Sequence, residues 1–422
     1  MQARFAARAA VVALLGLAAL ACYAAGWLAL VLLLQPAERR QAWAGRCLTG
    51  LLRRLGATYI KVGQILSTRP DLLPRPVIRE LEALQDHVGP FPFADVRATL
   101  EADFEEPLEV LFAELDPTPI ASASVAQVHA ATLPTGERVA VKVRRPGIER
   151  LVEFDLGAMR LGARLFSLIP SFGLLAPVES VEEFGRGIRM QLDFATEAAN
   201  NRRFRANFAG DPDVRFPALF DRLCSSRVLT MELIDGEKIL DYARTRSDPK
   251  RLAALGIRVL LKMIFEDGFV HADLHPGNLF VTRDDRIAIL DVGLVGELRG
   301  EHKDGLARYF AAFARGDGAT MARLMTSLSP GRGPRDPAAF ERAMVEFVGR
   351  YHGKRLGEVQ VSVVFLDMME LLRRHRVRAN PTFTLVNIAI IVTEGIGKQL
   401  DPEVDLMAAA APFFVRMAIA PA

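Results

Sequence analysis

Apolar residues follow a helical period over most of this chain, and a shorter central stretch alternates in the manner of strands. The first apolar run, from Ala9 to Leu34, carries no charged residue. At about 1.5 Å per residue it is long enough to cross a hydrocarbon core of roughly 30 Å. It is also longer than the apolar part of a signal peptide, so we expect a retained transmembrane helix. An apolar helix that lies in the membrane interface or packs on a partner is the alternative.

Basic residues flank this run unequally. Arg4 and Arg8 precede it, whereas the stretch that follows has Glu38 as its acid and contains the basic residues Arg39, Arg40, Arg46, Arg53, Arg54 and Lys61. The larger positive count predicts that the C-terminal side faces the cytoplasm, where ATP is available. We therefore expect a single-pass protein of the cell inner membrane with a cytoplasmic folded part, and the basic stretch suits contact with anionic head groups.

Helical patterns continue after the apolar run. The first begins near Leu55, carries Lys61, Gly63 and Gln64, and is ended by two prolines at 70 and 74. Two more helices are expected at about 75–85 and 94–104. This part of the chain therefore predicts a helical extension ahead of the strands.

Strand patterns begin at Pro119. A loop of small residues leads into a strand through Gln127 and His129, and the loop consists of Ala121, Ser122, Ala123 and Ser124. After a turn at Gly136, a second strand alternates up to Lys142. A third apolar run, from Arg227 to Gly236, contains Met231 and Leu233 and is typical of a strand.

A long helix is expected between these strands, from about Val181 to Asn207. It contains Gln191, Asp193 and Glu197, and the last two are four residues apart, so they are expected to share a face. Another helix is expected at 250–267, and helical periodicity resumes near Glu301 and runs to about Leu400. The apolar end, 406–422, is interrupted by a proline and an arginine and is not predicted to span a membrane.

These patterns predict an α+β protein of two lobes. The expected division is a membrane anchor at 1–35, a helical extension at 36–110, a first lobe at 111–236 and a helical second lobe at 237–422. The net charge of +3 is too small to favour a nucleic acid partner. The 3 cysteines form no CxxC pair, so neither a disulfide framework nor a zinc site is indicated.

The segment from Phe269 to Gly293 has the residues that phosphoryl transfer requires. Asp273 and Asn278 lie five residues apart on a loop. Asp291 follows a short apolar run and begins the sequence Asp-Val-Gly. A carboxylate can orient a nucleophile, while an amide oxygen and a second carboxylate can hold Mg²⁺ on phosphates. A polar loop between two strands is the plainer interpretation, but it does not account for the whole pattern.

Lys142 and Glu197 are the candidate nucleotide ion pair. In a kinase-like arrangement the small-residue loop 121–124 covers the phosphates, Lys142 contacts them, and Glu197 holds the lysine. The backbone at Met231 and Leu233 would then meet the adenine. A half-buried strand and a solvated acidic helix face are the simpler alternatives for these residues.

Together these motifs resemble the UbiB family of atypical kinases, which are associated with ubiquinone biosynthesis. The most specific motif is Lys61-x-Gly63-Gln64 with the Leu-Ser-Thr-Arg-Pro-Asp run after it; the small-residue loop with Gln127 and the loop from His271 to Asn278 are the others. The resemblance implies a kinase-like fold whose helical extension covers the active site, with Lys61 pointing at the catalytic centre.

The family's Glu-x-Asp motif falls on Gln191-Leu-Asp193, where glutamine replaces glutamate. A salt bridge from Lys61 would be reduced to a hydrogen bond at most. The resemblance further implies that Asp273 is the catalytic carboxylate and that Asn278 and Asp291 bind Mg²⁺.

The expected function is that of a membrane-associated atypical kinase or ATPase that binds Mg²⁺ and ATP and supports ubiquinone or another isoprenoid-lipid pathway. Membrane lipids or an isoprenoid precursor are the expected partners, with a biosynthetic enzyme complex and a homodimer as further expectations. Two alternatives stay open. One is a small-molecule phosphotransferase similar to choline and aminoglycoside kinases, and the other is a nucleotide-binding scaffold without catalysis.

Overall fold

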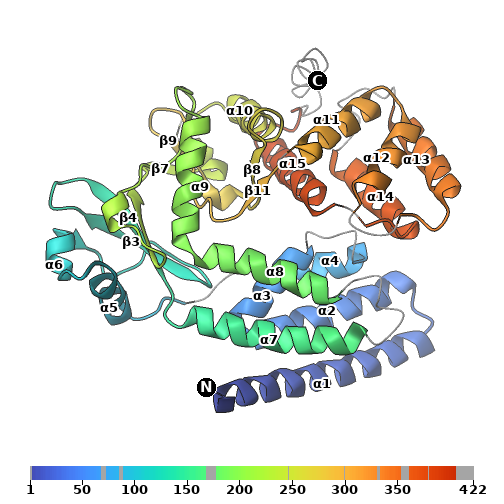
Figure 1. Ribbon diagram of the computed structural model, residues 1–422, viewed down its shortest axis with the longest axis horizontal. Coiled ribbons are helices and arrows are strands. Elements are labelled where there is room, and N and C mark those ends of the chain that lie inside the picture. Colours follow the sequence, from blue (N-terminus) through green and yellow to red (C-terminus); the bar gives the residue numbers. More distant parts are fainter. Residues whose placement is uncertain are drawn as a thin grey trace. The chain divides into compact units, whose positions relative to one another are not determined.

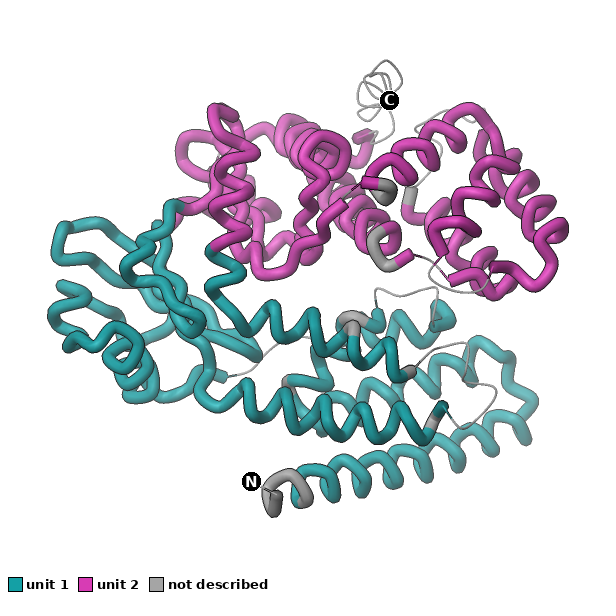
Figure 2. The backbone as a smooth tube through the Cα atoms, in the orientation of Figure 1, with its two compact units in different colours: residues 1–198, 218–233 teal, residues 199–217, 234–422 magenta. Residues whose placement is uncertain are grey.

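The computed structural model describes residues 2–404 except 68–72, 85–88, 168–176, 246, 299, 330–332, 353–360 and 379. The chain forms two compact units, which are coloured separately in Figure 2. Unit 1 comprises Met1–Ala198 and Ala218–Leu233, and unit 2 comprises Ala199–Pro217 and Ile234–Ala422. The fold is α+β, as expected from the alternation of helical and strand patterns. The expected division of the chain into four parts remains a prediction.

Unit 1 contains the N-terminal helices and a five-stranded sheet (Figure 1). Its helices are α1 Gln2–Leu32, α2 Ala37–Leu55, α3 Ala57–Ser67, α4 Arg75–Leu81, α5 Phe93–Phe104, α6 Leu108–Leu111, α7 Ile148–Ser167, α8 Pro177–Leu192 and the start of α9 Phe194–Asn207. Its strands are β1 Glu114–Leu115, β2 Ala121–Ser122, β3 Ala126–Thr132, β4 Arg138–Arg144 and β6 Val228–Glu232. All the strand pairings in this sheet are antiparallel.

The two faces of β4 pack against different helices. Val139, Val141 and Val143 are fully buried against α5 and α6. Ala140 lies on the opposite face, in a cluster with Phe194 and Ala198 of α9. Because side chains alternate along a strand, Lys142 shares the face of Ala140 and is directed toward α9.

Gln127 and His129 of β3 form a buried network that holds the segment before α5. The Gln127 amide exchanges hydrogen bonds with the backbone of Phe91 and lies 2.9 Å from Nε2 of His129. Nδ1 of His129 is 2.7 Å from the Asp116 carbonyl, to which it can only donate, so Nε2 accepts from Gln127. The network is fully satisfied by a neutral imidazole.

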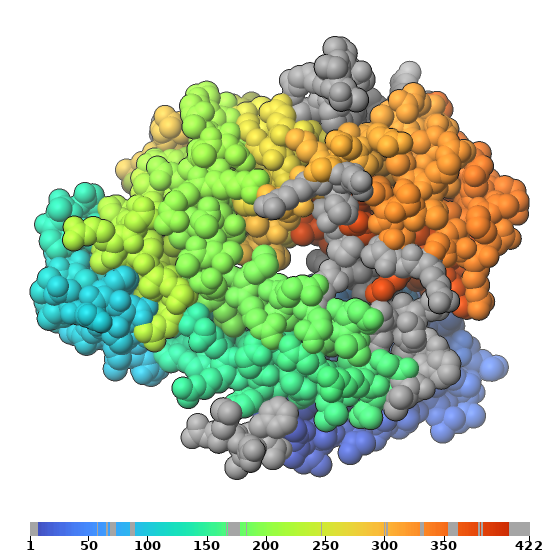
Figure 3. All heavy atoms as spheres, viewed as in Figure 1, coloured from blue at the N-terminus to red at the C-terminus, as the bar shows by residue number. Residues whose placement is uncertain are grey.

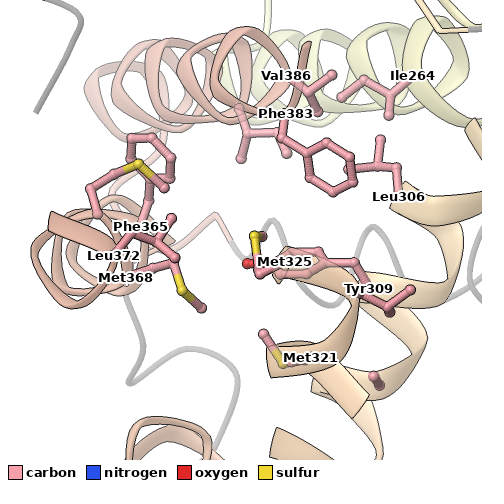
Figure 4. Close-up of a cluster of buried hydrophobic side chains, with 14 of the residues drawn as sticks. Ile264, Leu306, Tyr309, Met321, Met325, Phe365, Met368, Leu372, Phe383 and Val386 are labelled. Atoms are coloured by element: carbon pink, nitrogen blue, oxygen red, sulfur yellow. The ribbon is translucent and has the colours of Figure 1, made fainter. Parts of the chain in front are cut away.

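Unit 2 contains a four-stranded sheet, a two-stranded sheet and a helical layer. Its strands are β5 Val214–Arg215, β7 Gly236–Lys238, β8 Phe269–His271, β9 Leu279–Thr282, β10 Ile287–Ile289 and β11 Val295–Glu297. Its helices are α10 Pro249–Leu261, continued by a π-helical turn at Lys262–Asp267, α11 Glu301–Ala314, α12 Gly318–Ser327, α13 Pro337–Tyr351, α14 Val361–Arg374 and α15 Pro381–Leu400. Figure 4 shows how the helices bury a shared core, with Tyr309, Met325 and Phe383 among its members.

A turn at Gly268 ends the π-helical segment and starts β8. Its φ of 60° lies in the left-handed region, and a Cβ there would come 2.8 Å from the Leu298 carbonyl oxygen. Glycine is therefore required at this position, which leads directly into the loop that carries Asp273.

The expected long helix at 181–207 is wrong in one respect, because it is two helices. It breaks at Asp193, whose carboxylate accepts from the Ala195 N–H at 3.1 Å and from the Thr196 hydroxyl at 2.9 Å. Asp193 is therefore the N-cap of α9 and does not share a helix face with Glu197, as the spacing had suggested. The apolar period continues through the break, which is why the pattern alone missed it. The C-terminal stretch 406–422 lies outside the described residues.

Replacing Asp193 by alanine removes the cap of α9. We expect Asp193→Ala to lower the free energy of unfolding by about 1 kcal/mol, measured by urea denaturation. Asp193→Asn is the matched control, because the asparagine Oδ1 still accepts from the Ala195 N–H, and it should lie within about 0.5 kcal/mol of the wild type. Equal losses in both variants would mean that the charge, rather than the cap, stabilises this junction.

His129 predicts a dependence of stability on pH. Burial lowers the pKa of His129 below its ordinary value near 6.5. Below that pH the unfolded chain binds a proton that the folded chain does not bind. The contribution of His129 to the free energy of unfolding is therefore fully present above about pH 6.5 and decreases as the pH falls. Urea denaturation at pH 7.5 and 5.5 should show a smaller loss in His129→Gln than in the wild type. A loss of the same size in both would assign the pH dependence to other groups.

Candidate functional site

Lys142 and Glu197 form a buried ion pair in unit 1. The lysine Nζ lies 2.9 Å from Oε1 and 2.8 Å from Oε2 of Glu197, and the side chains are 9% and 3% exposed. The ammonium also lies 5.1 Å from the centre of the Phe194 ring. A charge pair this far from water is held in one geometry by bidentate contact and by the surrounding apolar cluster.

Helix α9 places the glutamate. Asp193 starts the helix, so that Glu197 falls in its first turn, where the helix dipole favours a carboxylate. Lys142 arrives from the face of β4 that is directed at α9. The cap and the strand register therefore produce the pair together.

The small-residue loop 121–124 is braced by its own backbone. Ala121 and Ser122 form β2 and pair with β3, and the Ala123 N–H donates to the Ala126 carbonyl at 2.8 Å. The guanidinium of Arg145 donates to the Ala123 carbonyl at 3.1 Å, and Ser124 is buried. Since the Ala123 amide already has an acceptor, it would have to release that bond before it could bind a phosphate.

Met231 and Leu233 lie at the end of unit 1. Met231 is buried on β6, between β4 and an isolated bridge to Leu219. The Leu233 N–H donates to the Arg138 carbonyl at 3.2 Å, and the chain enters unit 2 at the next residue. The backbone that is expected to contact adenine therefore lies where the chain leaves unit 1 and enters unit 2.

In unit 2, the loop that follows β8 is closed by its own polar groups. The Asp273 N–H donates to Nδ1 of His271 at 3.1 Å, and the Asn278 amide donates to the Asp273 carbonyl at 3.2 Å. His271 and Asn278 are buried, whereas Asp273 is exposed. His271 and Asn278 therefore hold the loop from inside, and Asp273 is an exposed residue of that loop.

Asp291 is brought to the same loop by the hairpin of β9 and β10. The Leu290 N–H donates to the Asn278 carbonyl at 2.8 Å, which places the next residue beside Asn278. Asp291 has a φ of 51°, in the left-handed region that few non-glycine residues occupy. Such a backbone is characteristic of functional sites, where surrounding structure maintains it.

Asn200 is a residue of this site that the sequence reasoning missed. Its side chain is buried and donates to the Val292 carbonyl at 3.0 Å, so α9 holds the segment that begins at Asp291. Asn200 lies three residues after Glu197, on the same side of the helix. That spacing was the available signal, but only the fold shows what the side chain reaches.

His271 is fully buried at the start of the loop that carries Asp273. Burial lowers its pKa, while the negative charges of Asp273 and Asp291 oppose that shift. Since Nδ1 accepts from the Asp273 amide, the proton of the neutral ring is on Nε2. The imidazole thus serves as a fixed acceptor for the loop.

The oxygen atoms at this loop suit Mg²⁺ that is shared with phosphates. Among the described residues no group of three or more His, Cys, Asp or Glu side chains is placed to hold a metal on its own. Mg²⁺ commonly takes one or two protein ligands and completes its shell with water and phosphate oxygens. The Asn278 amide nitrogen donates to the Asp273 carbonyl, so the side-chain oxygen is the atom of Asn278 that could bind a cation.

The Lys61-x-Gly63-Gln64 motif lies on α3 of unit 1. A Cβ on Gly63 would overlap the side chains of Leu84 and Leu52, so glycine is needed for α3 to pack against its neighbours. The Gln64 amide donates to the Leu84 carbonyl at 3.4 Å, and Lys61 and Gln191 are half-buried. Residues 68–72 of the motif lie outside the described residues. The expectation that Lys61 points at the catalytic centre remains a prediction.

Two family models match consecutive parts of the chain, the ABC1 atypical kinase-like domain over residues 83–325 and the UbiB helical domain over residues 344–405. A relative from Marinobacter nauticus named "Probable protein kinase UbiB" is 38% identical over 86% of this chain and 68% of its own. A relative of the same name from Pseudomonas aeruginosa is 37% identical over 90% and 73%. The solved Rv3197–erythromycin complex from Mycobacterium tuberculosis superimposes with a TM-score of 0.56 at 23% identity, covering 85% of this chain and 93% of that chain, which is a likeness of fold.

Removing the partner of Lys142 should leave a buried charge unpaired. We expect Glu197→Gln to lower the free energy of unfolding by about 3–5 kcal/mol in urea denaturation. The matched control is Glu153→Gln, which breaks the pair between Glu153 and Arg189, whose side chains are 49% and 40% exposed. That change should cost at most about 1 kcal/mol. Similar losses in the two variants would contradict a desolvated Lys142–Glu197 pair.

Proposed function

Because the chain belongs to the UbiB family of ABC1 atypical kinase-like proteins, we propose that it binds ATP with Mg²⁺ and hydrolyses ATP or transfers its γ-phosphate at a membrane. The observation that carries this proposal is the buried Lys142–Glu197 pair. In kinase-like sites a lysine that is held by a carboxylate in this way contacts the α- and β-phosphates of the nucleotide.

The residues of unit 2 support the remaining roles. Asn278 and Asp291 would hold Mg²⁺, which supplies neutralisation of the phosphate charge when bound. Asp273 has an exposed carboxylate on a loop fixed by His271 and Asn278, so it is suited to orient a hydroxyl or a water molecule. The loop 121–124 and the backbone at Met231 and Leu233 are proposed to contact the nucleotide.

We propose that the phosphate acceptor is an isoprenoid lipid and that the pathway is the biosynthesis of ubiquinone or a related quinone. This part rests on membership of the family rather than on the site. Coupling of ATP turnover to the handling of a membrane-bound precursor is the form of the reaction that we favour. A complex with other biosynthetic enzymes is the corresponding proposal for partners.

Helix α1 supports attachment to a membrane. The stretch Ala7–Leu32 has a mean hydropathy of 2.1, and none of its residues is fully buried inside the protein. A second apolar stretch, Phe383–Leu400, has a mean hydropathy of 1.2 and is 61% buried, and Phe383, Val386 and Ile390 belong to the core of unit 2. We therefore propose that α1 is the attachment and that α15 is a core helix, with the kinase-like part in the cytoplasm.

The test is ATP hydrolysis by the full chain, in detergent and in liposomes that contain anionic lipid. Turnover should require Mg²⁺, cease with a chelator, and fall on the order of 100-fold or more in Asp291→Asn. Asp284→Asn is the matched control, because Asp284 is an exposed aspartate of the turn between β9 and β10, and its rate should stay at the wild-type level.

Wild-type turnover in Asp291→Asn would contradict the assignment of this residue. Binding of nucleotide without turnover under both conditions would instead favour the non-catalytic scaffold. Phosphorylation of a soluble amine or alcohol, with no effect of liposomes, would favour the small-molecule phosphotransferase.

A further inference from the structure

Helix α1 has two distinct sides within unit 1. Half-buried positions recur every three to four residues and face α2 and α7, whereas the opposite side is open to solvent. That open side contains Leu14, Leu17, Leu20, Leu28 and Leu32, which are 60–73% exposed. Figure 1 shows α1 lying along α7, and Figure 3 shows its blue side chains on the surface of the molecule.

Arg8 fixes the N-terminal part of α1 to unit 1. Its guanidinium donates to both carboxylate oxygens of Asp155 on α7, at 2.7 and 3.1 Å, and the Asp155 side chain is 0% exposed. The same group donates to the Leu55 carbonyl at 2.5 Å, at the end of α2, and lies 5.9 Å from the Tyr59 ring centre. Arg8 therefore ties α1 to three other helices at once.

The C-terminal part of α1 is fixed to α2. A Cβ on Gly26 would overlap the ring of Trp43, and the Trp43 indole donates to the Tyr23 carbonyl at 3.3 Å. The Arg40 guanidinium lies 5.4 Å from the Trp27 ring centre. The helix is thus in contact with unit 1 near both of its ends.

These contacts determine how α1 can meet a bilayer. Helix α2 runs beside α1 and carries Arg39, Arg40, Arg46, Arg53 and Arg54, which a hydrocarbon core does not accept. For α1 to cross a membrane it would have to leave α2, and Asp155 would remain as a buried carboxylate without its arginine.

We propose that α1 lies in the plane of the membrane, with its open leucine side in the interface of a bilayer that contains anionic lipid. Interfacial helices combine an apolar face with a basic polar face. Here α1 supplies the apolar face. The exposed arginines of α2, such as Arg39, Arg53 and Arg54, supply the basic residues. A protein partner is disfavoured because the open side of α1 carries no charge or hydrogen-bonding side chain along Ala10–Leu32 other than the Cys22 thiol.

This inference rests on the membrane attachment proposed above and is independent of ATP turnover. It places both ends of α1 on the same side of the membrane, whereas a spanning helix places them on opposite sides. The difference is measurable with the full chain and does not require an active enzyme.

The first experiment labels one cysteine at each end of α1. Ala7→Cys and Glu38→Cys are made separately in full-length protein that also carries Cys22→Ser, Cys47→Ser and Cys224→Ser, in a bacterial host. A membrane-impermeant maleimide should label both positions in inverted inner-membrane vesicles and neither in intact spheroplasts. Labelling of residue 7 in spheroplasts, with residue 38 labelled in inverted vesicles alone, would overturn the proposal in favour of a span. Absence of the protein from the membrane fraction would overturn the attachment itself.

The second experiment locks α1 on α2 through native thiols. Cys22 lies on α1 and Cys47 on the neighbouring α2, and burial and the Cys22 thiol raise the pKa of Cys47. Full-length protein with Cys224→Ser is oxidised in detergent with copper phenanthroline to a Cys22–Cys47 disulfide, and is then floated with phosphatidylcholine–phosphatidylglycerol vesicles. The oxidised protein should bind within about twofold of the reduced protein. A tenfold or greater loss on oxidation would show that α1 must leave α2 to bind, which overturns the proposal.

The third experiment tests the open side itself. The double variant Leu14→Glu, Leu17→Glu should reduce flotation with the same vesicles by at least tenfold. Val110→Glu changes an apolar side chain that is 57% exposed on α6, and it should bind as the wild type does. Unchanged flotation of the double variant would overturn the proposal. Loss of a dimer in that variant, with no vesicle binding by the wild type, would assign the face to a second copy of the chain.

Discussion

A lysine that is removed from water must be paired, and the Lys142–Glu197 contact meets this constraint with both carboxylate oxygens. Three features of unit 1 serve that contact. The alternation of β4 turns Lys142 toward α9, the Asp193 cap starts α9 four residues ahead of Glu197, and the apolar cluster around Phe194 excludes water. The candidate nucleotide site therefore depends on a junction between helices as much as on the charged residues themselves.

Helix α9 also continues into unit 2, where Asn200 holds the Val292 carbonyl. One helix thus carries the residue that positions the lysine and the residue that positions the segment after Asp291. Because Glu197 and Asn200 are less than one turn apart, a rotation of α9 about its axis would disturb both contacts together. Both contacts therefore depend on the position of the same helix.

The order of strands and helices, the small-residue loop and the Asp273–Asn278 spacing could be predicted from the sequence, because each depends on local patterns. The Lys142–Glu197 contact could also be anticipated, since strand alternation and kinase-like order leave few partners for a buried lysine. The break at Asp193 could not, because apolar periodicity runs through it and the cap is revealed only by backbone geometry. The structural reason for Gly63 was equally hidden, since Leu52 comes to it from α2 and Leu84 from the segment after α4.

The contacts of Arg8 change how the N-terminal helix should be regarded. Anchored enzymes are often shortened to obtain a soluble form, on the assumption that the anchor and the folded part are independent. In this chain a shortened protein that started at Gln35 would lack the guanidinium that neutralises Asp155 and caps the carbonyl of Leu55. It would also uncover the Trp43 ring. The apolar helix is therefore a part of the fold of unit 1, so the folded part cannot be separated from the exposed leucines on the open side of that helix.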